Sequence, residues 1–505
     1  MILLIILFIL SLMISWMVIR IGIPLSYSFG IADRPGGHKG HDTITPFVGG
    51  LGIFIAFIIG INLSNDLQTP IDISSLCMQL SALIIFLTGF VDDIWQLDYK
   101  VRFLIQTVVA MAMALWGGVL LIDLGSLLST QPFELGMLAL PLTVFGTIGV
   151  INALNMIDGL DGLSGSVSFV SLFLIAIVAF IAGENAHLAL MMVLMGGVAG
   201  FLYFNLRWGT RKRAAVFLGD NGSMLLGFLF SWVLIDMSQG ENRAMTPVTG
   251  LWILAVPLMD AVGVIIRRIY FRQSPFKPDR NHLHHLLIRS GFRTQDIVYI
   301  ISMIQLVLGC IGLIGLYAGI PESLMLISFI GLFLGYCYVI ARPWRFVPTL
   351  RRLHTQTGLI SRDCRGVYVG GFPVQGSQYF IETLLRELQS RYPLDLYAHE
   401  TKWEKHDGRF LYATIPLFLT EDDVSTQEVQ SLILRLKALF KRHESVEIRQ
   451  YIDRDHRHDR RVGNKSITEE LRNKDRRSKH NSVLICKIFN NNSPAQTLEQ
   501  AANPV

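Results

Sequence analysis

Long apolar blocks dominate the first two thirds of the chain. From residue 1 to about 342, blocks of roughly 18–24 mostly apolar residues alternate with short polar stretches, and about 20 helical residues are needed to cross the hydrocarbon core of a bilayer. In a soluble chain, apolar residues would instead recur at helix or strand spacing. The pattern predicts eleven membrane-spanning helices, at residues 1–22, 47–64, 73–91, 102–122, 136–154, 164–182, 187–205, 219–238, 248–270, 297–319 and 323–341.

Basic residues give these crossings a predicted direction. Arg20 follows the first apolar block and no basic residue precedes it, which favours an N-terminus outside and argues against a cleaved signal peptide. Eleven crossings then place the C-terminus inside, and every Lys and Arg before residue 341 except Arg243 falls on the inner side. This asymmetry follows the positive-inside rule. We therefore predict an all-α polytopic membrane protein whose charged loops face the cytoplasm.

Composition agrees with this class of protein. The 505 residues are 51% hydrophobic and 16% charged, with a mean hydropathy of +0.45 and a net charge of +5. The basic residues suit anchoring at the inner leaflet, and nothing in their arrangement favours binding of nucleic acid. The five cysteines are scattered, have no metal-ligand spacing and imply no disulfides.

After residue 342 the apolar runs shorten, which predicts a separate cytoplasmic domain. We predict a small α+β domain at 343–452, in which strands 366–372, 394–400, 409–419 and 446–452 alternate with helices 377–391 and 425–442. The order β-α-β-β-α-β suits a ferredoxin-like sandwich. Residues 453–505 are predicted to be a charged, flexible tail. Regulation, partner docking and simple stabilisation all remain open as roles for this part of the chain.

Five aspartates gather at the ends of apolar blocks on the predicted inner side. Asp92 and Asp93 end the third block, Asp158 and Asp161 follow the fifth, and Asp220 opens the eighth. A carboxylate at the centre of a helix in lipid costs about 2.5–3.5 kcal/mol. Five acids at one water boundary therefore suggest a site for a divalent cation and a phosphorylated substrate.

Each acidic motif also has a purely structural interpretation. The first pair could be a solvated helix end, the second pair a glycine-rich turn, and Asp220 or Asn221 a helix N-cap. Asp158 and Asp161 are spaced i, i+3, so both lie on one face if helical, with Asn155 another three residues back. Two carboxylates about 4 Å apart repel by roughly 4 kcal/mol at an effective dielectric of 20. Such a pair needs a cation, a proton or donor groups, and Mg²⁺ takes one or two carboxylates together with phosphate oxygens.

Two inner loops add cationic donors. The first contains Lys39 among Arg34, His38 and His41, and the last contains Arg280, His282, His284, His285 and Lys277. A zinc site is the competing idea for the histidines, but three of them within four residues match zinc spacing poorly. Imidazoles that donate to a diphosphate or a sugar fit better. A Pro/Gly turn for the first loop and a solvated basic loop for the last remain the structural alternatives.

Five stretches together carry a family resemblance: DRPGGHKGH…TPFVGG, GFVDDIW, NALNMIDGLDGL, VFLGDNGS and SPFKPDRNHLHHLLIRSGF. In this order, over about residues 1–342, they resemble the polyprenyl-phosphate N-acetylhexosamine-1-phosphate transferases of glycosyltransferase family 4. Within that family they look like the bacterial undecaprenyl-phosphate GlcNAc-1-phosphate transferases. The family usually has Arg-Lys in the first loop where this chain has His38-Lys39. That departure weakens any detailed role for His38.

The resemblance implies an eleven-span enzyme of the bacterial cytoplasmic (inner) membrane, with its active site facing the cytoplasm. Such an enzyme transfers N-acetylhexosamine 1-phosphate from a UDP-sugar to undecaprenyl phosphate and releases UMP, in the first membrane step of a cell-surface polysaccharide. The His-Leu-His-His block resembles the branch that uses UDP-GlcNAc. UDP-GalNAc or a modified UDP-amino sugar remains the alternative donor, and a homodimer is compatible with the sequence.

The resemblance also implies roles for the residues that match the motifs. Asp220 would bind Mg²⁺, with Mn²⁺ as an alternative, and Asp92 or Asp93 would contact the lipid phosphate or act as a base. We expect the catalytic residues to be Asp92, Asp93, Asp158 and Asp161. We expect substrate contacts from Lys39, Asn155, Asp158, Asp161, Arg280, His282, His284 and His285. The placement of Lys39 at the lipid phosphate rests on its charge and depth alone.

Two other classes of function remain. A secondary transporter would also keep carboxylates in a polytopic chain, but it would place them near the bilayer midplane in two related halves. Here the acids cluster at the ends of the blocks and no repeat of halves is visible. A membrane scaffold for polysaccharide assembly is supported only by the additional C-terminal domain.

Overall fold

The computed structural model describes most of the apolar part of the chain and, beyond residue 350, only strands. The described residues are 2–29, 32–33, 45–68, 72–127, 131–207, 211, 213–241, 243–270, 272, 274, 282–290, 292–342, 346, 349–350, 366–370, 394–396, 402–406, 410–419, 446–452 and 482–488. The chain divides into two compact units, one of Met1–Leu286 with Thr294–Pro343 and the other of Leu287–Arg293 with Trp344–Val505. Each unit is described by itself below.

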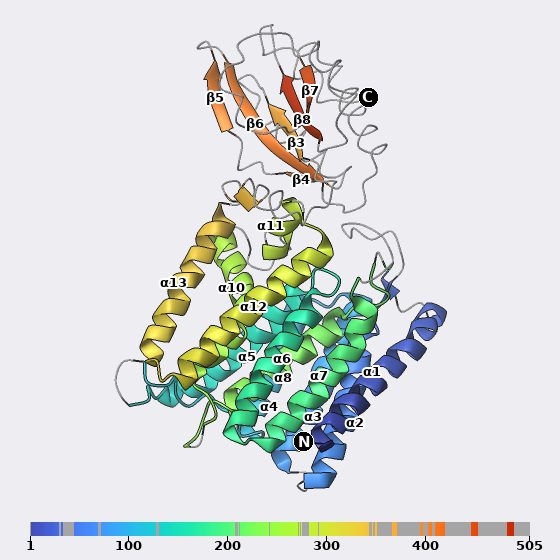
Figure 1. Cartoon of the computed structure of the whole chain (residues 1–505), viewed down its shortest axis with the longest axis vertical. Coiled ribbons are helices and arrows are strands. Elements are labelled where there is room, and N and C mark those ends of the chain that lie inside the picture. Colours follow the sequence, from blue (N-terminus) through green and yellow to red (C-terminus); the bar gives the residue numbers. More distant parts are fainter. Residues whose placement is uncertain are drawn as a thin grey trace. The chain divides into compact units, whose positions relative to one another are not determined.

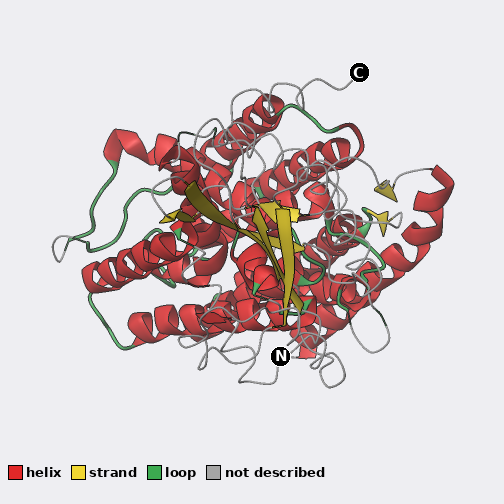
Figure 2. Cartoon of the chain, turned by 90° about the horizontal axis from the view of Figure 1, so that it is seen from above, coloured by secondary structure: helices red, strands yellow, loops and turns green. Residues whose placement is uncertain are grey.

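Helices make up almost all of the regular structure of the first unit (Figures 1 and 2). They are α1 (Ile2–Phe29), α2 (Gly49–Gln68), α3 (Ile73–Trp95), α4 (Tyr99–Leu115), α5 (Ala139–Ile157), α6 (Leu163–Ala182), α7 (Asn185–Asn205), α8 (Gly219–Asp236), α9 (Pro247–Ile253), α10 (Ala255–Tyr270), α12 (Thr294–Tyr317) and α13 (Glu322–Ala341). A short helix, α11 (Leu283–Arg289), begins in this unit. Two two-residue strands, β1 (Ala32–Asp33) and β2 (Thr45–Pro46), pair antiparallel.

Every predicted apolar block coincides with a helix, but not every helix has the length and hydropathy of a membrane span. Among the described residues, seven helices are long and apolar enough to cross a bilayer, or eight if α9 and α10 form one bent span. The exceptions are α2, α4 and α8. Helix α4 has only 17 residues, and α8 carries acids at both ends. The structure therefore supports a membrane protein, and the count of eleven crossings stays a prediction.

Helix α8 lies at the centre of the bundle. Every residue from Asn221 to Leu234 is buried, and α8 packs against α2, α3, α5 and α9. Small residues allow this close packing: a Cβ on Gly227 would come within 2.6 Å of the Ile151 Cα in α5. The first turn of α8, which carries Asp220, is thereby set between the ends of α3 and α5.

Helices α9 and α10 are separated by a sharp bend of 84°. The bend interrupts the helical hydrogen bonds near Leu254, and an unsatisfied backbone group in lipid costs several kcal/mol. Gln305 of α12 replaces the missing partners: its Oε1 accepts from the Val256 N–H (3.0 Å) and its Nε2 donates to the Ile253 carbonyl. Ser171 of α6 donates to the same carbonyl (2.9 Å). Side chains from two other helices thus stabilise the bend.

The described strands of the second unit form one six-stranded sheet, drawn in orange to red in Figure 1. They are β3 (Gly366–Gly370), β4 (Leu394–Leu396), β5 (Lys402–His406), β6 (Phe410–Leu419), β7 (Val446–Ile452) and β8 (Ser482–Ile488). The order is β4-β6-β3-β8-β7, with β5 also paired to β6. Strands β3 and β8 are parallel and the other pairs are antiparallel.

This sheet agrees with the predicted domain in four strands and differs in two. Strands β3, β4, β6 and β7 lie within the four predicted strands, whereas β5 and β8 were not predicted. Strand β8 falls inside the segment 453–505 that was predicted to be a charged tail; its sequence, SVLICKI, is apolar and contains one charge. It pairs between β3 and β7, which would be neighbours in a ferredoxin-like sheet. The predicted helices 377–391 and 425–442 lie outside the described residues, so the ferredoxin-like fold stays a prediction.

Candidate active site

A carboxylate from another helix holds the N-terminus of α8. Asp93, in the last turn of α3, accepts hydrogen bonds from the backbone N–H groups of Asp220 (2.8 Å) and Asn221 (3.2 Å). The Asn221 Nδ2 donates a further bond to the same carboxylate (2.6 Å). The first N–H groups of a helix lack partners within the helix and favour a nearby anion. Asp93 therefore supplies the capping role that the sequence left open for Asp220 or Asn221.

Two glycines bring α2 and α3 against this helix start. A Cβ on Gly50 would lie 1.8 Å from the Asn221 Oδ1, and a Cβ on Gly89 would lie 2.5 Å from the backbone of Asn221. Real Cβ atoms do not approach other atoms so closely, so only glycine fits at either position. The backbone at Gly219 has a φ of +77°, which also favours glycine. The glycines of this region are thus required by close contact between helices.

Arg102 of α4 joins two of the predicted carboxylates. Its Nη1 lies 2.6 Å from the Asp92 Oδ2 and 3.8 Å from the Asp220 Oδ2. Asp92 is buried, and its Oδ1 also accepts from the Leu97 N–H (2.7 Å). A charge buried to this degree needs a partner, and the guanidinium provides it. The buried Asp92 carboxylate is therefore stabilised by its ion pair with Arg102. Arg102 is a site residue that the sequence analysis did not single out.

The carboxylate of Asp220 is also oriented from α5. Asn155, in the last turn of α5, donates from Nδ2 to the Asp220 Oδ1 (2.6 Å) and to the Ser223 Oγ (3.1 Å). The structure thus brings together Asn155 and Asp220, which are 65 residues apart in the chain. With one oxygen held by Asn155, the other lies on the side of Arg102.

Asp158 directly follows α5 and lies among the other acids. Its removal from bulk water raises the pKa of its carboxyl well above the ordinary value, and the charges of Asp220, Asp93 and Asp161 raise the pKa further. Among the described residues, none donates a hydrogen bond to this carboxylate. The ionised form of Asp158 is therefore disfavoured in this site, and a nearby cation would stabilise it.

Asp161 is tied to the next loop rather than to Asp220. Its Oδ2 accepts from the Arg207 Nε (2.8 Å) and from the Ala214 N–H (2.9 Å), and its side chain is buried. The adjacent Gly162, at a φ of +83°, donates its N–H to the Asn205 Oδ1 (2.6 Å). These contacts fasten the loop between α5 and α6 to the end of α7. Asp158 and Asp161 therefore differ: Asp161 has hydrogen-bond partners, whereas Asp158 has none among the described residues.

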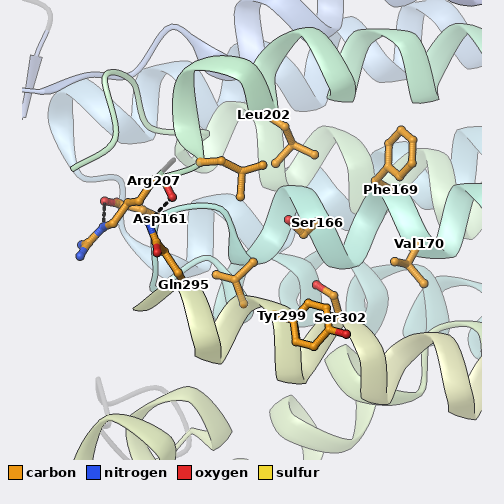
Figure 3. Close-up of a pocket in the computed structure, with 11 residues that line it drawn as sticks. Asp161, Ser166, Phe169, Val170, Leu202, Arg207, Gln295, Tyr299 and Ser302 are labelled. Carbon is orange, nitrogen blue, oxygen red and sulfur yellow. Dashed lines mark hydrogen bonds and ion pairs between the residues drawn. The ribbon is translucent and has the colours of Figure 1, made fainter. Parts of the chain in front are cut away.

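A pocket of about 340 Å³ opens beside this loop, between α6, α7 and α12 (Figure 3). The Asp161–Arg207 pair lies at one end of it and Phe169 and Val170 at the other. Its remaining lining residues are Ser166, Leu202, Leu206, Gln295, Val298, Tyr299 and Ser302. Apolar side chains dominate the lining, so the pocket is poorly suited to two phosphorylated substrates.

The histidine block lies against the Asp158 loop. A Cβ on Gly159 would lie 2.6 Å from the His284 Nε2, so the buried His284 ring touches the backbone of the residue that follows Asp158. The ring of His282 stacks on that of His284 with centroids 5.6 Å apart, and the ring of His285 lies 4.3 Å from that of His284. The predicted histidines therefore form one cluster at the edge of the acidic group.

Asp260 of α10 supports this cluster and was not predicted. It is 2% exposed and accepts from the His282 Nδ1 (2.9 Å), the Leu283 N–H (2.8 Å) and the Tyr336 hydroxyl of α13. A signal was present in the sequence, because Asp260 is the one acid inside the apolar block 248–270. An ionisable residue inside a predicted span is a functional candidate by default.

The cluster has more acids than paired cations, which suits a divalent metal. Arg102 and Arg207 pair with Asp92 and Asp161, while Asp93, Asp158 and Asp220 share no such ion pair closer than 3.8 Å in the described part of the chain. Within the same residues, no three His, Cys, Asp or Glu side chains form a complete metal cage. Mg²⁺ commonly binds through one or two carboxylates plus phosphate oxygens, so the donor set that fits it here is Asp220 with Asp158.

Two predicted substrate contacts lie outside the described residues. They are Lys39 in the first loop and Arg280 ahead of the histidine block. The other predicted residues all lie in the region described above, at the ends of α3, α5 and α11 and the start of α8.

Comparison with known proteins places this arrangement in a family. The model of glycosyl transferase family 4 matches residues 75–238, which include Asp92, Asp93, Asp158, Asp161 and Asp220. The chain is 33% identical over 327 residues to the undecaprenyl-phosphate alpha-N-acetylglucosaminyl 1-phosphate transferase of Escherichia coli (strain K12), covering 64% of this chain and 87% of the relative. Proteins of the same name from Haemophilus influenzae (34% over 331 residues, 65% and 92%) and Yersinia pestis (33% over 340 residues, 67% and 92%) are similar. The chain belongs to glycosyl transferase family 4.

Proposed function

We propose that this protein transfers N-acetylglucosamine 1-phosphate from UDP-GlcNAc to undecaprenyl phosphate and releases UMP. The observation that carries the proposal is the convergence of Asp158, Asp220 and the histidine cluster at one end of the helices, in a chain about one third identical to transferases named for this reaction. The product would begin a cell-surface polysaccharide at the inner membrane of a bacterium. UDP-GalNAc or a modified UDP-amino sugar is the alternative donor.

The site would work on the cytoplasmic face. Nucleotide sugars are cytoplasmic substrates, and the strong excess of Lys and Arg in the predicted inner loops supports this orientation. In the same topology the N-terminus would be outside, and Lys39 would contact the acceptor phosphate. A homodimer is compatible with this arrangement and is not required by it.

Asp220 and Asp158 would hold Mg²⁺ or Mn²⁺. The fit rests on the surroundings of the two carboxylates, since Asp158 has no described donor and Asp220 is oriented by Asn155. A bound divalent ion would supply positive charge where two phosphates meet. Arg102 keeps Asp92 neutralised, and Asp93 keeps the first turn of α8 in place, so both acids contribute to the position of Asp220.

The reaction proposed is a direct displacement. An oxygen of the lipid phosphate attacks the β-phosphorus of the UDP-sugar, the bond from that phosphorus to the bridging oxygen breaks, and UMP leaves with that oxygen. The acceptor is already anionic, so it needs positioning and charge neutralisation more than activation. His282, His284 and His285 would face the sugar diphosphate. Isolation of a covalent sugar-phosphate enzyme, or exchange of UMP without lipid, would contradict this mechanism.

The test is UMP release by the purified full-length protein in lipid nanodiscs, with UDP-GlcNAc, undecaprenyl phosphate and MgCl₂. We expect Asp220→Asn to lower kcat at least about 100-fold, because an oriented charge that acts in the transition state is lost. Asp236→Asn is the matched control, since Asp236 is at the other end of the same helix. It should retain full activity.

Three outcomes separate the alternatives. No UMP from any UDP-sugar would reject the transferase and favour a transporter or scaffold. UMP only from UDP-GalNAc or another amino sugar would change the donor but not the reaction. Normal catalysis by Asp220→Asn would reject the metal assignment.

A further inference from the structure

Asp260 is a buried acid in the middle of an apolar helix, and three donors surround it. Its Oδ2 faces the His282 Nδ1 at 2.9 Å, and its Oδ1 accepts from both the Leu283 N–H (2.8 Å) and the Tyr336 hydroxyl. Both oxygens therefore have partners. A buried carboxylate is costly to keep, and one whose contacts lead to the histidine cluster points to a role in function.

The carboxylate determines which nitrogen of His282 carries the proton. An ionised carboxylate only accepts hydrogen bonds, so the His282 Nδ1 must donate to it. The Nε2 of the same ring is then left for another partner. His282 also stacks nearly parallel on His284, at an interplanar angle of 7°, and His284 touches Gly159 beside Asp158. The ring is thus fixed on one face by stacking and at one nitrogen by Asp260.

We propose that Asp260 is a positioning residue, which acts on the nucleotide-sugar donor through His282. It fixes the ring orientation and the tautomer of His282, so that the lone pair of Nε2 is presented to an N–H or O–H group of the donor sugar. This inference rests on the proposed function. Partners that orient metal-bound histidines contribute 10-fold to 100-fold to metal affinity or activity, and we expect an effect of the same order for His282.

Asp260→Asn tests this role while it keeps the size and shape of the side chain. The Leu283 N–H and the Tyr336 hydroxyl both donate to Oδ1, so the amide oxygen of the new side chain must take that place and its NH₂ group must face His282. An NH₂ group donates, and His282 would have to accept at Nδ1 and carry its proton on Nε2. The substitution therefore reverses the tautomer while the shape stays the same.

We expect Asp260→Asn to lower kcat about 10-fold to 100-fold. On a His282→Ala background the same substitution should have almost no further effect, because an effect that passes only through His282 disappears with it. Tyr336→Phe removes a donor to Oδ1 and leaves the bond to His282, so its effect should be small. Asp236→Asn is the matched control: Asp236 pairs with His187 at 3.0 Å in another part of the bundle, and the variant should behave as wild type.

The unsubstituted protein provides a second measurement, which does not depend on whether a variant folds. In ¹⁵N-histidine-labelled full-length protein in nanodiscs, with the His282 signal assigned by its loss in His282→Asn, Nδ1 should be protonated. An unprotonated Nδ1, unchanged kcat in Asp260→Asn, or additive effects with His282→Ala would each overturn the inference. If the unsubstituted protein releases no UMP, the proposed function fails, whereas a fully active Asp260→Asn variant rejects the role of Asp260 alone.

Discussion

Asp158 differs from the other four aspartates in what its carboxylate contacts. Asp92 is paired with Arg102, Asp93 with the first N–H groups of α8, Asp161 with Arg207, and Asp220 with the Asn155 amide. Asp158 has like charges around it and a raised pKa. A folded protein that raises the pKa of an acid is destabilised by its ionised form.

Asp158→Asn should therefore stabilise the metal-free protein and inactivate it. In EDTA at pH 7 the variant should melt a few degrees higher than wild type, because the ionised carboxyl is less favourable in the folded than in the unfolded chain. The gain should vanish as the pH falls below the ordinary pKa of 3.8, where the carboxyl is neutral in both states. The kcat should fall about 100-fold. A lower melting temperature in EDTA would show that the folded protein does not disfavour the Asp158 charge.

At this scale the sequence predicted the set of acids but not their separate roles. The spacing of Asp158 and Asp161 indicated a shared face, whereas Asp161 pairs with Arg207 and Asp158 is surrounded by like charges. Arg102 was visible only as a basic residue of an inner loop. Its contact with Asp92 depends on how α3 and α4 meet, which local sequence does not encode.

At the scale of elements, glycine contacts set the positions of the helices around α8. Gly89 of α3 allows the backbone of Asn221 to approach α3 closely. A Cβ on Gly149 of α5 would instead meet no atom within 4 Å. The two glycines lie in predicted spans of similar composition. They differ in what a methyl group would meet.

Gly89→Ala should therefore disturb the site, and Gly149→Ala should not. A Cβ at Gly89 would lie 2.5 Å from backbone atoms of Asn221 and Asp220, and overpacking of this kind costs about 1–3 kcal/mol. We expect a lower melting temperature and reduced UMP release. Gly149→Ala should be neutral or slightly stabilising, because alanine is the better helix former by about 1 kcal/mol. Equal effects of the two substitutions would contradict the packing described for α8.

The element pattern was predictable to the extent that it depends on hydropathy. All eleven apolar blocks coincide with helices, since a long apolar run can satisfy its backbone in lipid only as a helix. The bend between α9 and α10 was not predicted, although Pro257 is a signal for it, because proline has no N–H to donate to the Ile253 carbonyl four residues earlier. The partner that replaces this bond, Gln305, belongs to a different helix, which local sequence does not show.

At the scale of the whole molecule, this chain is longer than the curated relatives it resembles. They align with 64–67% of this chain while 87–92% of their own length is covered. The relatives therefore have little room for a counterpart of the sheet formed by β3–β8. All described residues of the acidic cluster lie in the first unit.

A chain that ends at residue 343 should therefore keep its transferase activity. We expect UMP release within about threefold of the full-length protein, since a compact unit with its own core can fold alone. The measurement is kcat and KM of both proteins in the same nanodiscs. Loss of activity with an unchanged melting temperature would instead indicate that the second unit contributes to catalysis.

The sequence predicted the division near residue 342 from the change in apolar run length. It predicted the strands with clear β-branched and aromatic runs, such as β6, and missed β8 because charged residues precede it. Pairing of β8 between β3 and β7 is a long-range contact. Composition over a window gives no information about it.

The amide of Gln305 has a consequence for biogenesis. It completes the backbone hydrogen bonds at Val256, 49 residues earlier in the chain. This hydrogen bond can form only after the first half of α12 has been synthesised. We therefore expect α9 and α10 to stay in the translocon until α12 is inserted. Replacement of Gln305 should lower the yield of membrane-inserted protein, even if the molecules that do insert remain active.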